Sequence, residues 1–104
     1  MNLLKDLPTL QDDEEVFETL LQNPHLQIER IVSKLKNPGQ WYDQDHDEWV
    51  VLIEGQATIE FFEQNMQLLS RGDTLLIEAH QRHRVISTSE HAVWLAVHLK
   101  DKAS

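Results

Sequence analysis

From Leu26 onward the chain is a series of short segments in which apolar and polar residues alternate, and residues that break strands separate these segments. Alternation with a period of two places successive side chains on opposite faces of a β-strand. The first segment covers residues 26–33, and further segments follow at 48–54, 56–62, 66–69, 73–77, 83–88 and 92–99. Pro38-Gly39, Gly55 and Gly72 interrupt the series at turns. This spacing predicts an all-β fold, an antiparallel barrel or sandwich.

The stretch before Leu26 predicts a different element. In "DDEEVFETLLQNP", Asp12 and Glu15 have the spacing of a capping box, and Asn23-Pro24 would end a helix. The apolar residues between them form a stripe at helical spacing, namely Val16, Phe17, Leu20 and Leu21. We therefore expect one domain over residues 1–104, with residues 26–99 forming the β architecture and residues 1–25 a short helical segment packed outside it.

Composition limits the partners and the chemistry. The 104 residues contain no cysteine and no apolar run long enough to cross a bilayer, and the first fifteen residues do not resemble a secretory signal. We expect a cytoplasmic protein in which any metal is held by nitrogen and oxygen ligands. A formal net charge of −9 disfavours nucleic acid and anionic membrane surfaces as partners, because both attract basic proteins.

Two spaced motifs resemble those of the cupin superfamily. Six residues separate Glu48 from Gly55, and ten residues separate Gly72 from His83. The first cupin motif is H-x-H, three or four residues, E, six residues, G, and the second begins with G and reaches its histidine after ten residues. The resemblance covers about residues 26–99. It implies a double-stranded β-barrel, or jelly roll, with a central cavity.

In that family two histidines of the first motif, the glutamate and the histidine of the second motif hold a divalent metal. Glu48 and His83 match the last two. The first two positions hold Tyr42 and Gln44 with the three-residue spacing, or Trp41 and Asp43 with the four-residue spacing, so the H-x-H is absent. The resemblance implies iron, manganese, nickel or zinc on His83, Glu48 and Gln44, and His98 in the last strand is a third candidate nitrogen.

The residues themselves support a polar cavity. Strand alternation places Tyr42, Gln44 and Glu48 on one face, which we assign to the cavity, with Tyr42 and Glu48 as candidate acid–base groups. His80 and Arg82 flank His83 in sequence and are candidates for the ligand pocket. An inward arginine would favour a carboxylate-bearing ligand. His46, between two aspartates, is expected to be a solvated residue at the rim.

Two functions remain open at this stage. One is a metal-dependent cupin that binds or converts a small polar or acidic molecule. The other is a metal-free module for small-molecule binding, sensing or dimerisation. Amide and phenol oxygens are weak donors for transition metals, so the sequence leaves catalysis undecided. Apolar Ile28, Ile31 and Val32 occupy both faces of the strand at 26–33, which predicts a homodimer.

Overall fold

The computed structural model describes residues 1–100, and every regular element in this range is a β-strand. The strands are β1 (Glu14–Gln22), β2 (Leu26–Lys34), β3 (Asp47–Glu54), β4 (Gln56–Phe61), β5 (Met66–Ser70), β6 (Thr74–Ile77), β7 (His83–Thr88) and β8 (Ala92–Leu99). No helix in the described range is long and apolar enough to cross a membrane.

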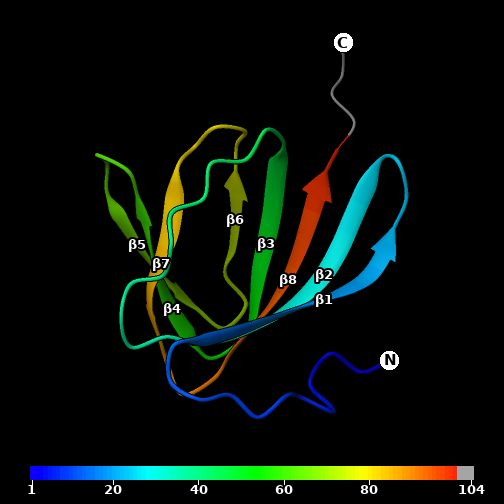
Figure 1. Cartoon of the computed structure of the whole chain (residues 1–104), viewed down its shortest axis with the longest axis vertical. Helices are drawn as coiled ribbons and strands as arrows, with labels where there is room; N and C mark the ends of the chain where they lie inside the picture. Colours follow the sequence, from blue (N-terminus) through cyan, green and yellow to red (C-terminus); the bar gives the residue numbers. More distant parts are fainter. Residues whose placement is uncertain (101–104) are drawn as a thin grey trace.

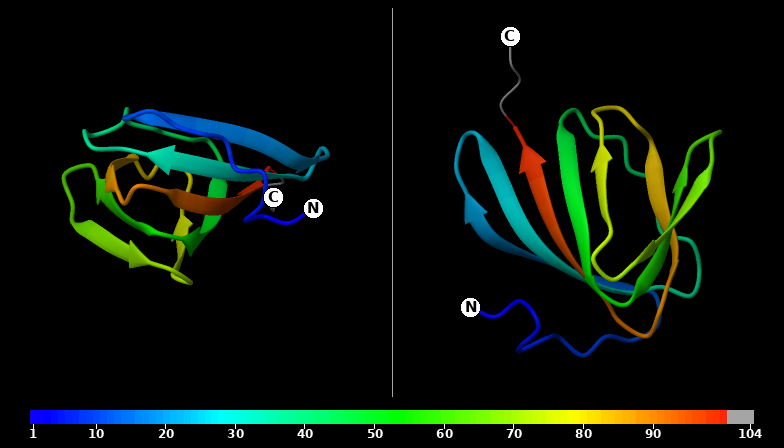
Figure 2. Two further views of the ribbon diagram at one scale, coloured as in Figure 1. Left: turned by 90° about the horizontal axis from the view of Figure 1, so that it is seen from below. Right: turned by 180° about the vertical axis from the view of Figure 1, so that it is seen from behind.

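The strands form two antiparallel sheets that face each other (Figures 1 and 2). The larger sheet has the order β1-β2-β8-β3-β6, and the smaller sheet has the order β5-β4-β7. The all-β jelly-roll prediction is therefore confirmed in its coarse form. The two sheets do not join into a closed barrel, because no strand of one sheet pairs with a strand of the other in the described range. An isolated β-bridge joins Tyr42, in the segment before β3, to His83 at the start of β7.

The predicted N-terminal helix is wrong, because residues 14–22 form strand β1 at the edge of the larger sheet. The register between β1 and β2 shifts between Thr19 and Leu21, which leaves Leu20 as the extra residue of a β-bulge. Phe17 pairs with Ile31 on the inner face, whereas Leu21 pairs with Ile28 after the shift. The bulge occurs where two leucines, Leu20 and Leu21, are adjacent in the sequence. This doubled apolar position makes the strand pattern resemble a helical stripe.

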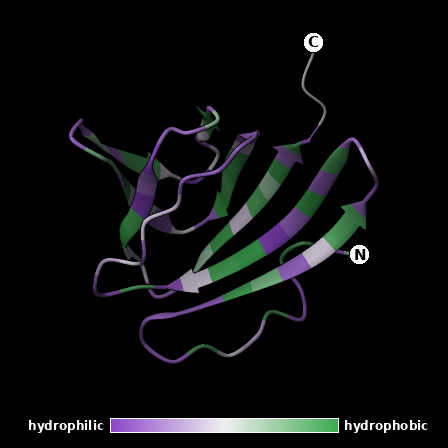
Figure 3. Cartoon of the chain, turned by 45° about the horizontal axis from the view of Figure 1, so that its top comes forward, coloured by the Kyte–Doolittle hydropathy of each residue, from purple (hydrophilic) through white to green (hydrophobic). Residues whose placement is uncertain are grey.

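The hydrophobic core fills the space between the sheets. Alternation in β3 buries Glu48, Val50 and Leu52 and leaves Trp49 exposed on the outside. The other core residues come from both sheets and include Ile31, Ala57, Ile59, Phe61, Leu69, Ile77, Trp94 and Ala96. In Figure 3, apolar segments alternate with hydrophilic ones along the strands of the larger sheet. Strand alternation therefore determines which polar residues point between the sheets, beside this core.

The N-terminal segment is fastened to the larger sheet by a buried arginine. Arg30 is 1% exposed, and its guanidinium donates to Glu18 on β1 and to the backbone oxygens of Leu3, Lys5 and Asp6. These acceptors offset the desolvation of the charge. Residues 1–6 are therefore part of the folded domain.

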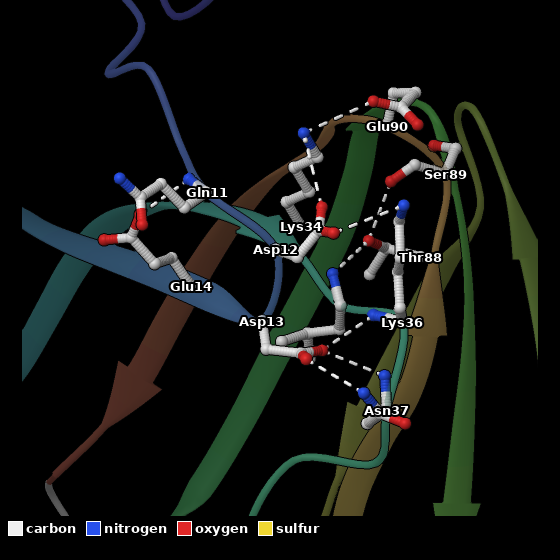
Figure 4. A network of polar contacts seen from close by, with 11 residues as sticks. Gln11, Asp12, Asp13, Glu14, Lys34, Lys36, Asn37, Thr88, Ser89 and Glu90 are labelled. Atoms are coloured by element: carbon white, nitrogen blue, oxygen red, sulfur yellow. Dashed lines mark hydrogen bonds and ion pairs between the residues drawn. The ribbon is translucent and has the colours of Figure 1, made fainter.

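A second polar network lies where the chain enters β1 (Figure 4). The Asp13 carboxylate accepts from the backbone N–H groups of Lys36 and Asn37, each at 2.9 Å, and from the Asn37 side chain. Lys34 makes ion pairs with Asp12 and Glu90. The network connects the start of β1, the end of β2 and the turn before β8, at the end of the sheet where the chain leaves β2.

Candidate functional site

A cavity of ≈ 80 Å³ lies between the two sheets. Its lining combines apolar and polar side chains, namely Glu15, Phe17, Glu29, Ile31, Tyr42, Gln44, Glu48, Val50, Ile59, Ile77, His83, Val85, Trp94 and His98. A buried water needs roughly 10–15 Å³ by this measure, so there is room for about half a dozen waters or a molecule of similar size. The cavity can hold a small ligand.

Five of the residues that the sequence selects lie in this lining, namely Tyr42, Gln44, Glu48, His83 and His98. Glu48 and His98 are direct cross-strand partners on β3 and β8. Tyr42 reaches His83 through the isolated bridge, in which each backbone N–H donates to the oxygen of the other residue at 2.8 and 3.0 Å. Two sheets and one loop therefore converge on a single polar region.

His83, at the start of β7, is 7% exposed and has one ring nitrogen engaged. Its Nδ1 lies 2.9 Å from the backbone oxygen of Gln81. A carbonyl only accepts, so Nδ1 carries the proton, and in the neutral ring Nε2 is then an acceptor. No described residue forms a hydrogen bond with this Nε2. His83 Nε2 can therefore accept a hydrogen bond from a ligand.

His98 is the centre of a chain of polar contacts that leads to the surface. Its Nε2 lies 2.7 Å from Glu29 Oε1, and its Nδ1 lies 2.9 Å from Nε2 of His46. His46 Nδ1 in turn lies 3.0 Å from the exposed carboxylate of Asp45. His46 is thus a partner of a cavity residue, and the rim position predicted for it accounts for only part of its role.

The carboxylates around His98 change its pKa. Burial, the largest single influence, lowers the pKa, but the hydrogen bond to Glu29 and the charges of Glu48 and Glu29 together outweigh it. The pKa of His98 is therefore raised above its usual value of 6.5. Protonated His98 balances part of the negative charge in the cavity.

Glu48 and Gln44 present oxygens that accept no hydrogen bond from the described residues. Glu48 is 6% exposed, and its nearest charged partner in the described range is His98 Nε2, at 3.9 Å, beyond hydrogen-bond distance. Gln44 Oε1 is the one fully buried side-chain oxygen or nitrogen in the described part of the chain that has no partner. A buried polar atom without a partner is unfavourable, so these acceptors favour a donor from outside the chain.

The structure adds two acidic residues that the sequence did not single out. Glu29 on β2 shares the inward face with Ile31, and Glu15 on β1 accepts from Ser33 Oγ at 2.8 Å. Burial raises the pKa of the Glu15 carboxyl, against the hydrogen bond from Ser33, which lowers it. The inward alternation of β2 was a usable signal for Glu29, whereas the helical interpretation concealed Glu15.

His80 and Arg82 do not line the cavity. His80 is exposed, and its Nδ1 lies 2.9 Å from Asp43. The Arg82 guanidinium lies 4.3 Å from the centre of the Phe62 ring, and that of Arg84 lies 4.3 Å from the centre of the Trp41 ring. These contacts hold both arginines on the aromatic surface outside the cavity.

The donor set does not suit a transition metal in this arrangement. Among the described residues, no three histidine or acidic side chains are grouped so that they could hold a metal ion. Both ring nitrogens of His98 are already engaged by Glu29 and His46. His98 would have to break one of these contacts to become a ligand, and the remaining set of His83, Glu48 and Gln44 has a single nitrogen. The predicted metal stays a prediction that this geometry does not favour.

The paired sheets and the polar residues between them define a jelly-roll protein with an internal site. The sequence profile of the Cupin domain family matches residues 36–98, more than half of the chain. This chain belongs to the cupin superfamily. No protein of curated function matches it.

Solved structures agree with this assignment. A protein of Ralstonia eutropha JMP134, provisionally named a mannose-6-phosphate isomerase, is 40% identical, with 97% of each chain covered and a TM-score of 0.83. A cupin superfamily protein of Desulfitobacterium hafniense DCB-2 is 20% identical, with a TM-score of 0.80. The alignment covers 96% of this chain and 90% of the other chain. An RmlC-like cupin of Methanocaldococcus jannaschii is 17% identical, with a TM-score of 0.75. The alignment covers 91% of this chain and 84% of the other chain.

Proposed function

We propose that this cupin binds a small polar molecule in the cavity between its sheets, without a metal. The observation that carries the proposal is the unpaired Oε1 of Gln44, buried beside Glu48 and the free Nε2 of His83. Three acceptors that have no hydrogen-bond donor among the described residues form a recognition site once a ligand supplies the donors.

The name of the Ralstonia eutropha protein points to a sugar phosphate. A phosphate site needs backbone N–H groups or cationic side chains, and arginine is the usual choice. Neither arginine nor lysine lines the described cavity, and Arg82 and Arg84 lie on the aromatic surface. The cavity therefore gives no support for a phosphorylated or other acidic ligand.

The test is a thermal-shift screen of small polar molecules in the presence of a chelator, followed by calorimetry on each hit. A ligand that binds only the folded state raises the unfolding temperature. Gln44→Leu removes the acceptor at nearly constant volume and should weaken binding about five- to tenfold, as expected for one lost hydrogen bond. Gln64→Leu, in the exposed turn after β4, is the matched control and should change nothing.

Elemental analysis of the purified protein decides between this proposal and the metal-dependent alternative. Stoichiometric iron, manganese, nickel or zinc, lost in both His83→Ala and Glu48→Ala, would replace the proposal with a metal-dependent function. Hits that bind Gln44→Leu as tightly as the original chain would also contradict it.

A further inference from the structure

We infer that the ligand of the cavity is a small organic cation, with an ammonium or guanidinium head and a short apolar stem. The inference deepens the proposed function and depends on it. Its basis is the charge, the hydrogen-bonding capacity and the shape of the lining.

The charge of the lining is negative. Glu15, Glu29 and Glu48 all line the cavity, and no lysine or arginine in the described range faces them there. His98 contacts Glu29 at 2.7 Å and can balance one carboxylate, whereas His83 donates its Nδ1–H to the backbone oxygen of Gln81. Glu48 is left 3.9 Å from the shared imidazole, with no other cationic partner in the described part of the chain. A cationic ligand would supply the missing countercharge.

The hydrogen-bonding groups agree with this sign. Glu48, Gln44 Oε1 and His83 Nε2 all accept, and none has a donor among the described residues. An ammonium carries three donors and a guanidinium five, and neither has an acceptor. A carboxylate ligand would instead bring further acceptors to a site that already has too many, and a neutral hydroxyl would supply one donor.

Much of the remaining lining is apolar. Phe17, Ile31, Val85 and Trp94 face the same cavity, from both sheets. An apolar stem of three or four carbons fits a space that holds about half a dozen waters. The head would then lie at Glu48 and Gln44, and the stem would pack against the aliphatic and aromatic walls.

The test uses three probes of equal chain length and different charge, namely butylammonium, 1-butanol and butyrate. Binding is followed by two-dimensional NMR at constant ionic strength and with a chelator present, which removes free metal as an explanation. The Trp94 indole and His83 ring resonances report the cavity. We expect butylammonium to bind at least tenfold more tightly than 1-butanol, and butyrate to leave these resonances unchanged.

Two variants assign the preference to the cavity carboxylate. Glu48→Gln keeps the shape and removes the charge, and should weaken butylammonium binding at least tenfold. Glu63→Gln removes the same charge from the exposed turn after β4 and should keep the affinity within twofold. If Glu48→Gln does not fold, the order of the three probes on the unaltered chain still decides the inference.

The outcomes separate the inference from the proposed function. Binding of butyrate or 1-butanol at the cavity, as tight as that of butylammonium, overturns the cation and leaves a small-molecule site intact. Absence of any shift with butylammonium at millimolar concentration also overturns the cation, and the broader screen of polar molecules then decides the proposed function.

Discussion

His98 binds Glu29 and His46 through its two ring nitrogens, and the contact with Glu29, together with the charge of Glu48, raises its pKa. The raised pKa means that the folded chain holds the proton more tightly than the unfolded chain does. The resulting stabilisation is fully present below the unfolded value of about 6.5 and is lost as the pH rises through the higher folded value. Stability from this residue therefore decreases on the alkaline side.

Glu29→Gln should lower the pKa of His98, because the substitution removes the carboxylate that accepts from Nε2. The loss of stability between about pH 6.5 and the folded-state pKa should become smaller in the variant. NMR titration of the His98 ring, with urea unfolding at several pH values, measures both effects. Glu63→Gln, a surface change of equal charge, should leave the His98 titration in place. Identical titrations in Glu29→Gln and the original chain would refute the assigned cause.

At the scale of single elements, the β3–β4 turn depends on one glycine. Gly55 is the one residue between the two strands and has a φ of 91°. A side-chain carbon there would collide with the backbone oxygen of His91 and lie 2.7 Å from Ser89 Oγ. Gly72 has the same φ of 91°, but a carbon added there meets nothing within 4 Å.

Alanine variants of these two glycines distinguish the cost of backbone strain from the cost of a steric collision. Gly72→Ala should cost about 1–2 kcal/mol, the penalty of a left-handed conformation for a residue with a side chain. Gly55→Ala should cost about 1–3 kcal/mol more, because the turn between β7 and β8, which contains His91, has to move. Urea unfolding of the two variants gives the difference. Equal free energies of unfolding would show that the contact at His91 is harmless.

Strand β1 shows why part of the fold was predicted wrongly from the sequence. The alternating segments from Leu26 onward became β2 to β8 with small changes at their ends, because one buried face imposes a period of two. In β1 the bulge at Leu20 interrupts that period, and Asp12 and Glu15 have the spacing of a helix cap by coincidence. A local pattern cannot distinguish a bulged edge strand from a short amphipathic helix, since pairing with β2 decides between them.

The candidate site was only partly predictable, for a similar reason. Spacing placed Glu48 and His83, and alternation placed Tyr42, Gln44 and His98, all of which line the cavity. Glu29 meets His98 only because β2 pairs with β8, some seventy residues later in the chain. Arg82 was a candidate for the ligand pocket because it is next to His83 in the sequence. Neighbouring side chains in an extended segment point to opposite sides, and Arg82 lies over Phe62, outside the cavity.

At the scale of the whole molecule, one apolar row crosses the outer face of the larger sheet. Cross-strand pairing aligns Leu21, Ile28, Val97, Trp49 and Leu76. Trp49 is 38% exposed and Leu76 49% exposed. The predicted homodimer was based on Ile28, Ile31 and Val32. Ile28 belongs to this row, whereas Ile31 and Val32 are buried within the chain, so the row is the better basis for the prediction. The homodimer stays a prediction.

Trp49→Lys should convert a dimer into a monomer if two copies pair through this row, because a charge would then be buried at the centre of the contact. Leu68→Lys, on an apolar position of the smaller sheet that is more exposed than Trp49, should leave the dimer in place. Analytical ultracentrifugation at micromolar concentration distinguishes the two states. An unaltered chain that sediments as a monomer would exclude the pairing.

The guanidinium of Arg30 also makes the first six residues a structural requirement. Three of its acceptors are main-chain oxygens of Leu3, Lys5 and Asp6, and main-chain oxygens are present whatever the side chains are. The amino acids in this segment can therefore vary widely, but the length of chain that passes over the sheet cannot. Proteolytic trimming there would remove three acceptors of the guanidinium and leave Glu18 as its remaining counterpart.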